Sequence, residues 1–554
     1  MRRLPALLLL AVLACAPAAP PPVVAPATPA FAPTSVARRV VLLSFDGLGA
    51  DALARQSGLA AFDRLAREGA VARVIPVNPT LTAPTHVSIL TGADPQRTGI
   101  VSNRFHTPGT PEDVTTRAME TDSDVETLVE AARRQGKRVG SMSFPTIDNG
   151  SARRTADFGI AWAMPLTHSR VVKLTRADFR REWVPPTWTE RPHRRQSFSP
   201  IMRARIEWGV PAHVLQDVDL VAYDTTDDRV ENYDLLLVEA GEQEIAPDEK
   251  GWFAVSRSTA DGLYGSWSKI LQRTAALDVT IYWGPIDRNN AWPEPFRTML
   301  DSEAGFWPGA ADEEVDAGRD TYVEQLQRLA AFTTRIQTLA ITRMPFDLLL
   351  LYRSEVDAAS HRYLGTAEAE PVIATAFGLA DRGVAAVAEV LEPSDALVVT
   401  GDHGMAVVER EVRVNTLLAE KGFAPRWRAF AAGNLAHLYR FDEPDDTAAL
   451  MAMLTTTGYF ERVEKRSPDM HRNAGDVLAW GWPNIAFSAM NDQPSVIAVT
   501  RGQHGALNVH RELHPAFFAY GAGVRPGALG EIGQTRIARY VAGLLGIAPP
   551  RAAD

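Results

Sequence analysis

The chain has 554 residues and a net charge of −10, and its acidic and basic residues are mixed along its length. Because no basic tract stands out, nucleic-acid binding is not expected as its main role. The only cysteine is Cys15, so disulfides cannot stabilise a domain that begins after it, and a chain of this length can bury a large core without them.

Residues 1–15 are predicted to be a signal peptide, because two arginines precede an apolar run too short to span a membrane. The run ends at Cys15 in a sequence that resembles a bacterial lipobox, in which the cysteine is lipidated. An ordinary signal peptide, cleaved at one of the alanines of 14–19, is the alternative. Residues 16–38 are rich in Ala and Pro and predict an extended spacer. We therefore expect an exported protein, a periplasmic or outer-membrane lipoprotein of a bacterium, held to the membrane by its lipid anchor only.

Several apolar runs end in residues that bind metals. Unbroken runs of Val and Leu are typical of parallel strands buried on both faces, and open α/β sheets bind ligands beyond the carboxyl ends of their strands. The candidates are Asp46, Asp357, His361, Asp402, His403 and, in a separate Gly-Gln-His-Gly sequence, His504. Each alone also fits a turn, a helix cap or a surface pair. Together, three Asp and three His suit two zinc ions with three protein ligands each, because mixed imidazole and carboxylate ligation favours zinc.

The nucleophile candidate is Thr82, in the sequence Thr82-Ala-Pro-Thr-His86 just ahead of a predicted helix. Free N–H groups and the helix dipole attract anions at such a place. A threonine hydroxyl is a poor nucleophile by itself, and metal coordination is one way to activate it. The alternative is a plain helix cap by Thr80, Thr82 or Thr85.

One α/β domain is expected over 39–550, interrupted by an insertion at 170–315. The insertion is rich in Trp, Pro and Arg and contains strand-like pairs, which predicts a mostly β or irregular unit. It either caps the active-site edge or decorates the surface. Residues 421–460 are expected to form a smaller α+β segment.

The order of the motifs resembles the alkaline phosphatase superfamily, especially its type I phosphodiesterase/nucleotide pyrophosphatase branch. The matching motifs are Asp46-Gly, Thr82-Ala-Pro-Thr-His, Gly99-Ile-Val-Ser-Asn103, Asp357 to His361, Asp402-His-Gly-Met and His504-Gly. The resemblance implies a core in which helices flank a central, largely parallel sheet. It also implies an enzyme that hydrolyses small phosphate esters, such as nucleotides or other diesters.

The resemblance further implies the role of each residue. The implied ligands are Asp357, His361 and His504 for one zinc, and Asp46, Asp402 and His403 for the other. Thr82 would bridge toward the second zinc and form a phospho-threonine intermediate in a two-metal displacement. Asn103 would donate to a non-bridging phosphoryl oxygen, and Tyr352 would form one wall of a slot for the substrate's base. The alternative for Tyr352 is a packing residue at the end of its strand.

Two departures from the motifs of the family affect the predicted substrate class. Ala83 stands where the family often has the aromatic residue of the other wall, which weakens the case for nucleotides but not for phosphoryl chemistry. A threonine-type alkaline phosphomonoesterase is the alternative, although only Arg153 and Arg154 could replace the Lys-x-Arg pair typical of those enzymes. The third candidate function is that of an inactive binding lipoprotein. We expect diesters to be preferred over monoesters, and no oligomeric state is predicted.

Overall fold

The computed structural model describes residues 31–162, 165–182, 196–241, 243–309 and 315–553. The predicted signal peptide, Cys15 and most of the predicted spacer lie outside the described residues. The last part of that spacer, 31–38, packs against the domain. The ring of Phe31 stacks on Tyr540 with centroids 4.6 Å apart, and the Thr34 N–H donates to the Gly523 carbonyl.

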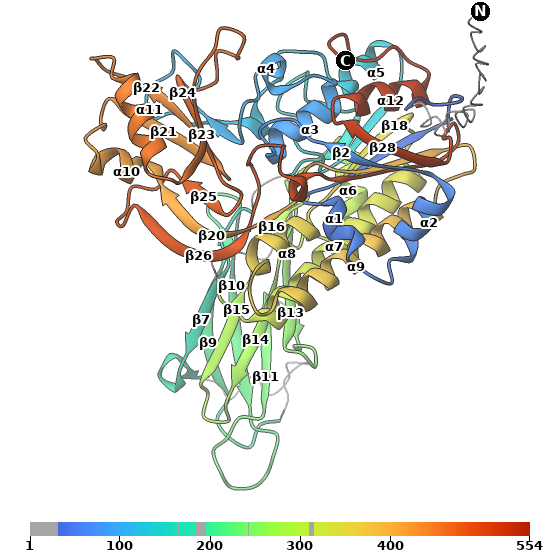
Figure 1. Ribbon diagram of the computed structural model, residues 1–554. Coiled ribbons are helices and arrows are strands. Elements are labelled where there is room, and N and C mark those ends of the chain that lie inside the picture. The colour runs from blue at the N-terminus through green and yellow to red at the C-terminus, as the bar shows by residue number, and fades with distance from the viewer. Residues whose placement is uncertain (1–30, 163–164, 183–195, 242, 310–314, 554) are drawn as a thin grey trace, which may run out of the picture.

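A nine-stranded sheet between two layers of helices forms the centre of the protein (Figure 1). In spatial order its strands are β17 (Ala291–Trp292), β6 (Phe158–Ile160), β5 (Val139–Met142), β18 (Leu348–Arg353), β1 (Val40–Phe45), β19 (Ala396–Gly401), β27 (Ala516–Gly521), β2 (Ala70–Ile75) and β28 (Gly527–Gly533). Neighbouring strands are parallel except where β17 or β27 takes part. The predicted α/β class, with a largely parallel sheet flanked by helices, is confirmed.

Both faces of this sheet are covered, which explains the unbroken apolar runs. Val40 and Leu42 of β1 face one core, while Val41 and Leu43 face the other, because successive side chains of a strand point to opposite sides. The first face is covered by α3 (Thr82–Thr91), α5 (Leu128–Arg134) and α12 (Arg536–Leu545). The second is covered by α1 (Ala50–Ala54), α2 (Ala60–Glu68), α6 (Glu294–Glu303), α7 (Arg319–Arg343) and α9 (Ala369–Glu389).

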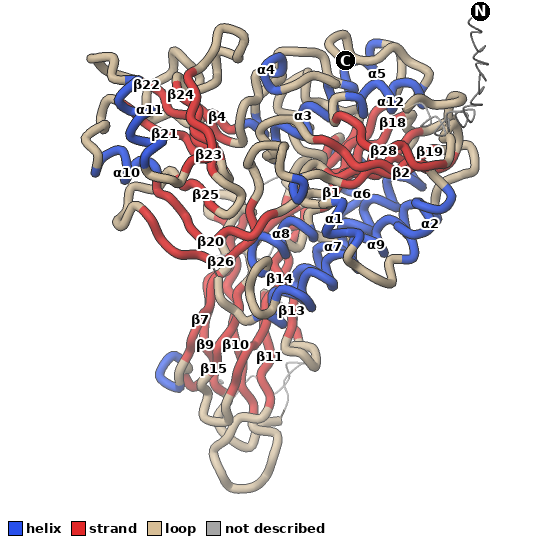
Figure 2. The backbone as a smooth tube through the Cα atoms, in the orientation of Figure 1, coloured by secondary structure: helices blue, strands red, loops and turns tan. Residues whose placement is uncertain are grey.

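The insertion forms two antiparallel sheets that share one apolar core and project away from the central domain (Figures 1 and 2). One sheet contains β12 (Gln243–Ile245), β11 (Leu235–Ala240), β10 (Val214–Tyr223), β9 (Met202–Val210) and β8 (Arg180–Arg181). The other contains β13 (Trp252–Thr259), β14 (Gly262–Arg273), β15 (Val279–Trp283) and β7 (Arg170–Leu174), with β16 (Asp287–Arg288) beside β14. β17 and α6 fall inside the predicted range of the insertion, yet they belong to the central sheet and its helix layer, because Phe296 and Leu300 of α6 are part of that core.

Helix α7 holds the insertion in place. The guanidinium of Arg328 lies between two indole rings of the insertion, 4.5 Å from the centroid of Trp252 and 4.1 Å from that of Trp267. One turn earlier, Glu324 accepts from Lys269 at 2.7 Å. Cation–π contacts and a partly buried ion pair thus join the two units along one helix.

A second unit follows β19. It contains a three-stranded sheet of β25 (Ile485–Ser488), β20 (Ala406–Arg413) and β26 (Val496–Gln503), and a four-stranded sheet of β21 (Trp427–Ala432), β22 (Leu435–Arg440), β24 (Val477–Gly481) and β23 (Phe460–Lys465). Helices α10 (Val414–Glu420) and α11 (Thr447–Thr456) share its apolar core. The α+β segment expected at 421–460 is part of this larger unit.

Shorter elements of the described chain are α4 (Pro95–Thr98), the hairpin of β3 (Arg104–Phe105) and β4 (Thr116–Arg117), and α8 (Glu355–Tyr363). Three 3-10 helices lie at Ala118–Glu120, Arg176–Asp178 and Arg511–Leu513. By length and composition, α9 is the one described helix that could cross a membrane. Half of its apolar window is buried, and it packs against α7 and α8 as a core helix does.

Candidate metal centre

The six predicted metal ligands come together at one edge of the central sheet. Asp46 follows β1, Asp402 and His403 follow β19, and Asp357 and His361 lie on α8, directly after β18. His504 follows β26 of the second unit. They form two groups, Asp46 with Asp402 and His403, and Asp357 with His361 and His504. Within each group the ligand atoms lie within 4.8 Å of one another, so each could hold a metal ion.

The first group, which we call the buried group, consists of Asp46, Asp402 and His403. The His403 Nε2 lies 3.2 Å from Asp46 Oδ1 and 3.0 Å from Asp402 Oδ2, and the three side chains are at most 4% exposed. Neither of these two carboxyl oxygens has a hydrogen-bond partner. Burying an unpaired carboxylate oxygen is costly, so these orphaned atoms fit a site that holds a cation.

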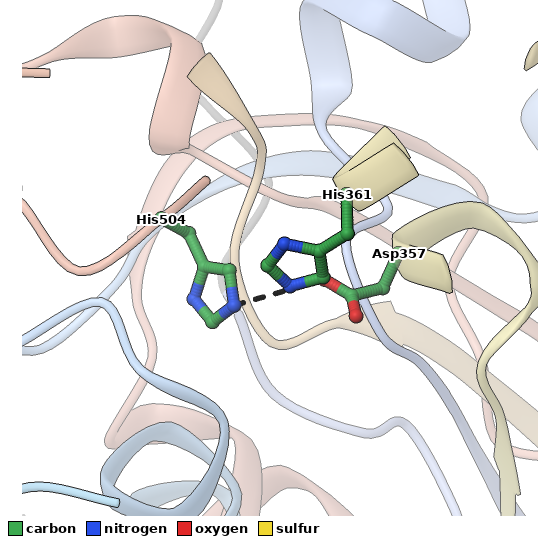
Figure 3. Close-up of side chains that lie close together, drawn as sticks. All are labelled: Asp357, His361 and His504. Carbon is green, nitrogen blue, oxygen red and sulfur yellow. Dashed lines mark ion pairs between the residues drawn. The ribbon is translucent and has the colours of Figure 1, made fainter. Parts of the chain in front are cut away.

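The second group, which we call the open group, consists of Asp357, His361 and His504 (Figure 3). Asp357 Oδ1 lies 3.3 Å from the His361 Nε2 and 3.7 Å from the His504 Nε2, and it too is buried without a hydrogen-bond partner. The Asp357 and His361 side chains are 15% and 16% exposed. The rings of His403 and His504 stack with centroids 3.5 Å apart, which brings the two groups side by side.

All three histidines present the same nitrogen to their group. The Nδ1 atoms of His403, His361 and His504 lie 3.1, 3.1 and 2.9 Å from the backbone carbonyls of Gly404, Gly502 and Thr80. A carbonyl oxygen can only accept, so each Nδ1 carries a proton, and in the neutral imidazole the Nε2 then offers its lone pair. Histidine ligands of metals are typically held by such a bond on the second nitrogen.

The pKa values at the centre reflect charges held close together. Burial raises the pKa of Asp357 to about 6, and the charge of Asp46 adds to the shift. Burial also lowers the pKa of His504 well below its ordinary value, assisted by His403 and His361. His403 differs, because Asp402 and Asp46 raise its pKa in spite of its burial. A divalent cation between these groups would relieve the repulsion among the carboxylates.

Gly47 is required where the two groups meet. Its φ is +72°, and a Cβ added there would lie 3.0 Å from the Asp357 Cα. Its N–H also donates to Asp402 Oδ1 at 3.1 Å. The Asp-Gly sequence after β1 is thus more than a turn signal, because a larger residue would push α8 away from the site.

Thr82 is the first residue of α3, and its hydroxyl faces the buried group, 3.4 Å from the His403 Nε2. The next N–H, that of Ala83, donates to Asn103 Oδ1 at 2.8 Å. Because an N–H can only donate, the amide oxygen of Asn103 must face Ala83, which leaves the amide NH₂ as the free donor. The structure therefore places the Thr82 hydroxyl and the amide of Asn103 at the N-terminus of α3.

Two supporting residues were not predicted as site residues. His86 lies inside the Thr82 motif. Its Nδ1 is 2.8 Å from the Thr82 carbonyl and 3.4 Å from Asp402 Oδ2. Gln534 donates to the Asp402 carbonyl at 2.7 Å and accepts from the Val77 N–H. No local signal marks Gln534, which precedes a C-terminal helix far along the chain.

Tyr352 lies between the buried group and a neighbouring cavity, and its predicted contact with the substrate's base stays a prediction. The residue is 5% exposed, and its hydroxyl donates to Asp46 Oδ2 at 2.6 Å, so its polar end faces a predicted metal ligand. The two arginines considered for a phosphate grip are also occupied. Arg153 donates to Glu130 at 2.9 Å, and Arg154 donates to Asp122 and Asp148 at 2.6 and 2.9 Å.

A cavity of about 130 Å³ lies beside Tyr352, between α7 and the base of the insertion. Its apolar lining includes Trp162, Trp307, Leu326, Leu329 and Ala330. Arg353 and Glu355 also line it, but they are paired with each other at 2.6 Å. The cavity is therefore suited to an uncharged group.

This fold and this edge of the sheet define an enzyme of the alkaline phosphatase superfamily. The chain belongs to the type I phosphodiesterase/nucleotide pyrophosphatase family, whose sequence model matches residues 40–240 and 259–499. It is accordingly a phosphoric diester hydrolase, and the family suggested by its motifs is confirmed. A search of curated proteins found no match.

Solved structures agree with this fold. Murine ectonucleotide pyrophosphatase/phosphodiesterase 5 superposes with a TM-score of 0.52 at 13% identity, over 92% of this chain and 96% of that one. Its human counterpart gives 0.53 at 14% identity over the same shares. Phosphonoacetate hydrolase from Sinorhizobium meliloti 1021, in complex with phosphonoformate, gives 0.51 at 15% identity, over 93% and 96%. At these identities the likeness shows the fold.

Proposed function

We propose that the protein is an exported, zinc-dependent phosphodiesterase that acts through a phospho-threonine intermediate at Thr82. The observation that carries the proposal is the pair of Asp/His groups at one sheet edge, with the Thr82 hydroxyl 3.4 Å from a ligand atom of the buried group. Each group offers three protein ligands, which leaves further positions open, as in catalytic zinc sites. Membership of a phosphodiesterase family supports the same conclusion.

In this mechanism the Thr82 oxygen forms a bond to phosphorus while the bond to the leaving alkoxide breaks. When bound, zinc would lower the pKa of the attacking hydroxyl and stabilise the developing negative charge. The Asn103 NH₂ donates to a non-bridging oxygen, and the Ala83 N–H at the start of α3 holds the amide oxygen of Asn103 in place. Water then breaks the Thr82–phosphorus bond, so the product phosphate carries the oxygen of that water and the threonine is restored.

The charges around the site favour diesters over monoesters. A monoester brings one more negative charge, which is best met by additional cations around the phosphoryl oxygens. The two arginines that could supply them, Arg153 and Arg154, are bound to carboxylates. Asn103 is a neutral donor. A diester needs a surface for its second substituent, and the apolar cavity beside Tyr352 provides one.

The size of the cavity narrows the substrate class further. A cavity of about 150 Å³ with apolar walls holds one benzene molecule. The cavity here, about 130 Å³, therefore suits one six-membered ring or a short alkyl group. We infer that aryl and short alkyl diesters are better substrates than nucleotides, whose base and ribose together are larger.

The main experiment compares kcat/KM for bis(p-nitrophenyl) phosphate and for p-nitrophenyl phosphate with zinc-loaded protein. We expect the diester to be hydrolysed faster. Faster hydrolysis of the monoester would overturn the proposal in favour of a phosphomonoesterase. A second comparison uses phenyl and methyl esters of p-nitrophenyl phosphate. The phenyl ester should be preferred, and Leu329→Trp, which fills the cavity, should remove that preference.

Export through a lipid anchor is proposed from the sequence of residues 1–15 alone. Mass spectrometry of the mature N-terminus should find Cys15 as the first residue, with its lipid. Cys15→Ala should release the enzyme from the membrane fraction. An unmodified N-terminus between residues 15 and 20 would favour the ordinary signal peptide instead.

A further inference from the structure

We propose that Tyr352 is a positioning residue, which orients the Asp46 carboxylate and thereby sets the metal affinity of the buried group without changing that of the open group. The inference rests on the proposed function, because it requires that the two groups bind metal. It gives the Tyr352 hydroxyl a role at the metal centre, while the residue also lines the cavity proposed for the substrate.

The backbone places Tyr352 next to Asp46. Tyr352 stands opposite Ser44 in the parallel pairing of β18 with β1, and the Asp46 N–H donates to the Arg353 carbonyl at 2.9 Å. The ring packs edge-on against His86, with centroids 5.6 Å apart. The strand register and this ring contact together direct the hydroxyl toward Asp46, where it donates at 2.6 Å.

This hydrogen bond makes the two oxygens of Asp46 unequal. Oδ2 accepts from Tyr352, while Oδ1 is buried, has no hydrogen-bond partner and lies 3.2 Å from the His403 Nε2. A carboxylate held by one oxygen cannot rotate freely, so the other oxygen stays directed toward the ligand atom of His403. The geometry therefore assigns Oδ1 as the ligand atom and Oδ2 as the anchor.

The open group offers an internal comparison. Asp357 also presents an unpartnered Oδ1 to its histidines, but no described tyrosine donates to it, and its side chain is 15% exposed. Loss of a hydrogen bond behind a metal ligand typically lowers affinity about 10–100-fold. The loss of the Tyr352 hydroxyl should therefore weaken one metal site and leave the other as it was.

The test is Tyr352→Phe, which removes the hydroxyl and keeps the ring. Apoprotein is titrated with zinc against a chromophoric chelator, and the two binding steps are fitted separately. We expect one step to weaken about 10–100-fold and the other to remain unchanged. The effect should persist in a His504→Ala background, where the buried group is intact, and disappear in an Asp402→Asn background.

The matched control is Tyr540→Phe. Tyr540 is a buried tyrosine of α12 that packs on Phe31 and Phe517 in the core, away from the metal groups. This variant should leave both binding steps unchanged. Two unchanged steps in Tyr352→Phe, or two equally weakened steps, would overturn the inference while the proposed function stands. Wild-type protein that binds fewer than two zinc ions would overturn both.

Discussion

The buried and the open group contain the same kinds of ligand atom but differ in their surroundings. Side chains of the buried group are at most 4% exposed, and donors from Tyr352 and Gly47 hold its carboxylates. Two side chains of the open group are about 15% exposed. If both groups bind metal as proposed, we expect ligand type to set which metal binds, and burial and supporting hydrogen bonds to set how tightly each ion is held and how fast it exchanges.

The proposed nucleophile, Thr82, lies beside only one of the two groups. The Thr82 hydroxyl lies near His403 of the buried group. A more rigid site for the attacking oxygen and a more accessible site for the leaving oxygen would suit a reaction in which the leaving alcohol must depart before water enters.

The largest effect is expected from Thr82→Ala. Turnover should fall by several orders of magnitude, because the covalent route is removed. Zinc content, measured by elemental analysis, should stay close to two ions per chain, since Thr82 is not needed to complete either group. Thr82→Ser should retain part of the activity. Near-wild-type turnover of Thr82→Ala would move the nucleophile elsewhere, with Thr80 and Thr85 tested next.

Removing one ligand from each group should separate the two sites. Asp402→Asn and His504→Ala should each bind about one zinc ion and lose most activity, because two metals are needed for the displacement. The ion left in His504→Ala should be the more tightly held, since its group is the buried one. Full occupancy of both sites in either variant would contradict the assignment of the groups.

A buried carboxylate outside both groups serves as a reference. Asp287 is 5% exposed, and burial raises its pKa to about 7, although the Arg288 N–H and the Arg288 charge act in the opposite direction. Because the folded pKa lies above the unfolded value of 3.8, ionisation opposes folding. The contribution of this group should thus lower the free energy of unfolding as pH rises from about 4 to 7. Above pH 7 the full penalty remains, and this contribution no longer changes with pH.

Asp287→Asn isolates the contribution of Asp287 ionisation to the free energy of unfolding. The substitution removes the ionisable group and keeps an acceptor for the Arg288 N–H. It should be more stable than the wild type at pH 8, by up to about 4 kcal/mol, and by much less at pH 4. Urea unfolding at the two pH values measures the difference. If Asp287→Asn and the wild type were equally stable at pH 4 and at pH 8, the pKa of Asp287 would not be raised by folding.

The smallest effect is kinetic. A chelator in excess should remove zinc from the wild-type protein in two phases, the faster one from the open group, with rates that differ about tenfold or more. In His504→Ala only the slow phase should remain, and in Asp402→Asn only the fast one. Zinc release is followed with a colorimetric chelator, and re-addition of zinc should restore activity to the wild type. A single phase would mean that the exposure of Asp357 and His361 does not govern exchange.

Local sequence was sufficient to predict the sheet and the gathering of Asp46, Asp357 and Asp402. A strand covered on both faces must be apolar throughout, so β1, β18 and β19 are recognisable without their neighbours. Once those strands are parallel neighbours, the residues after them must meet at one edge. The order of motifs then identified the family.

The role of each of these residues could be assigned only from the tertiary structure. Tyr352 follows an apolar run in the same way as a substrate contact would, and only the register of β18 against β1 aims its hydroxyl at Asp46. Arg153 and Arg154 carry charge in any fold, and only the packing of 122–154 neutralises them. Burial, supporting bonds and the free charge of a side chain depend on residues far apart in sequence, and no local pattern specifies them.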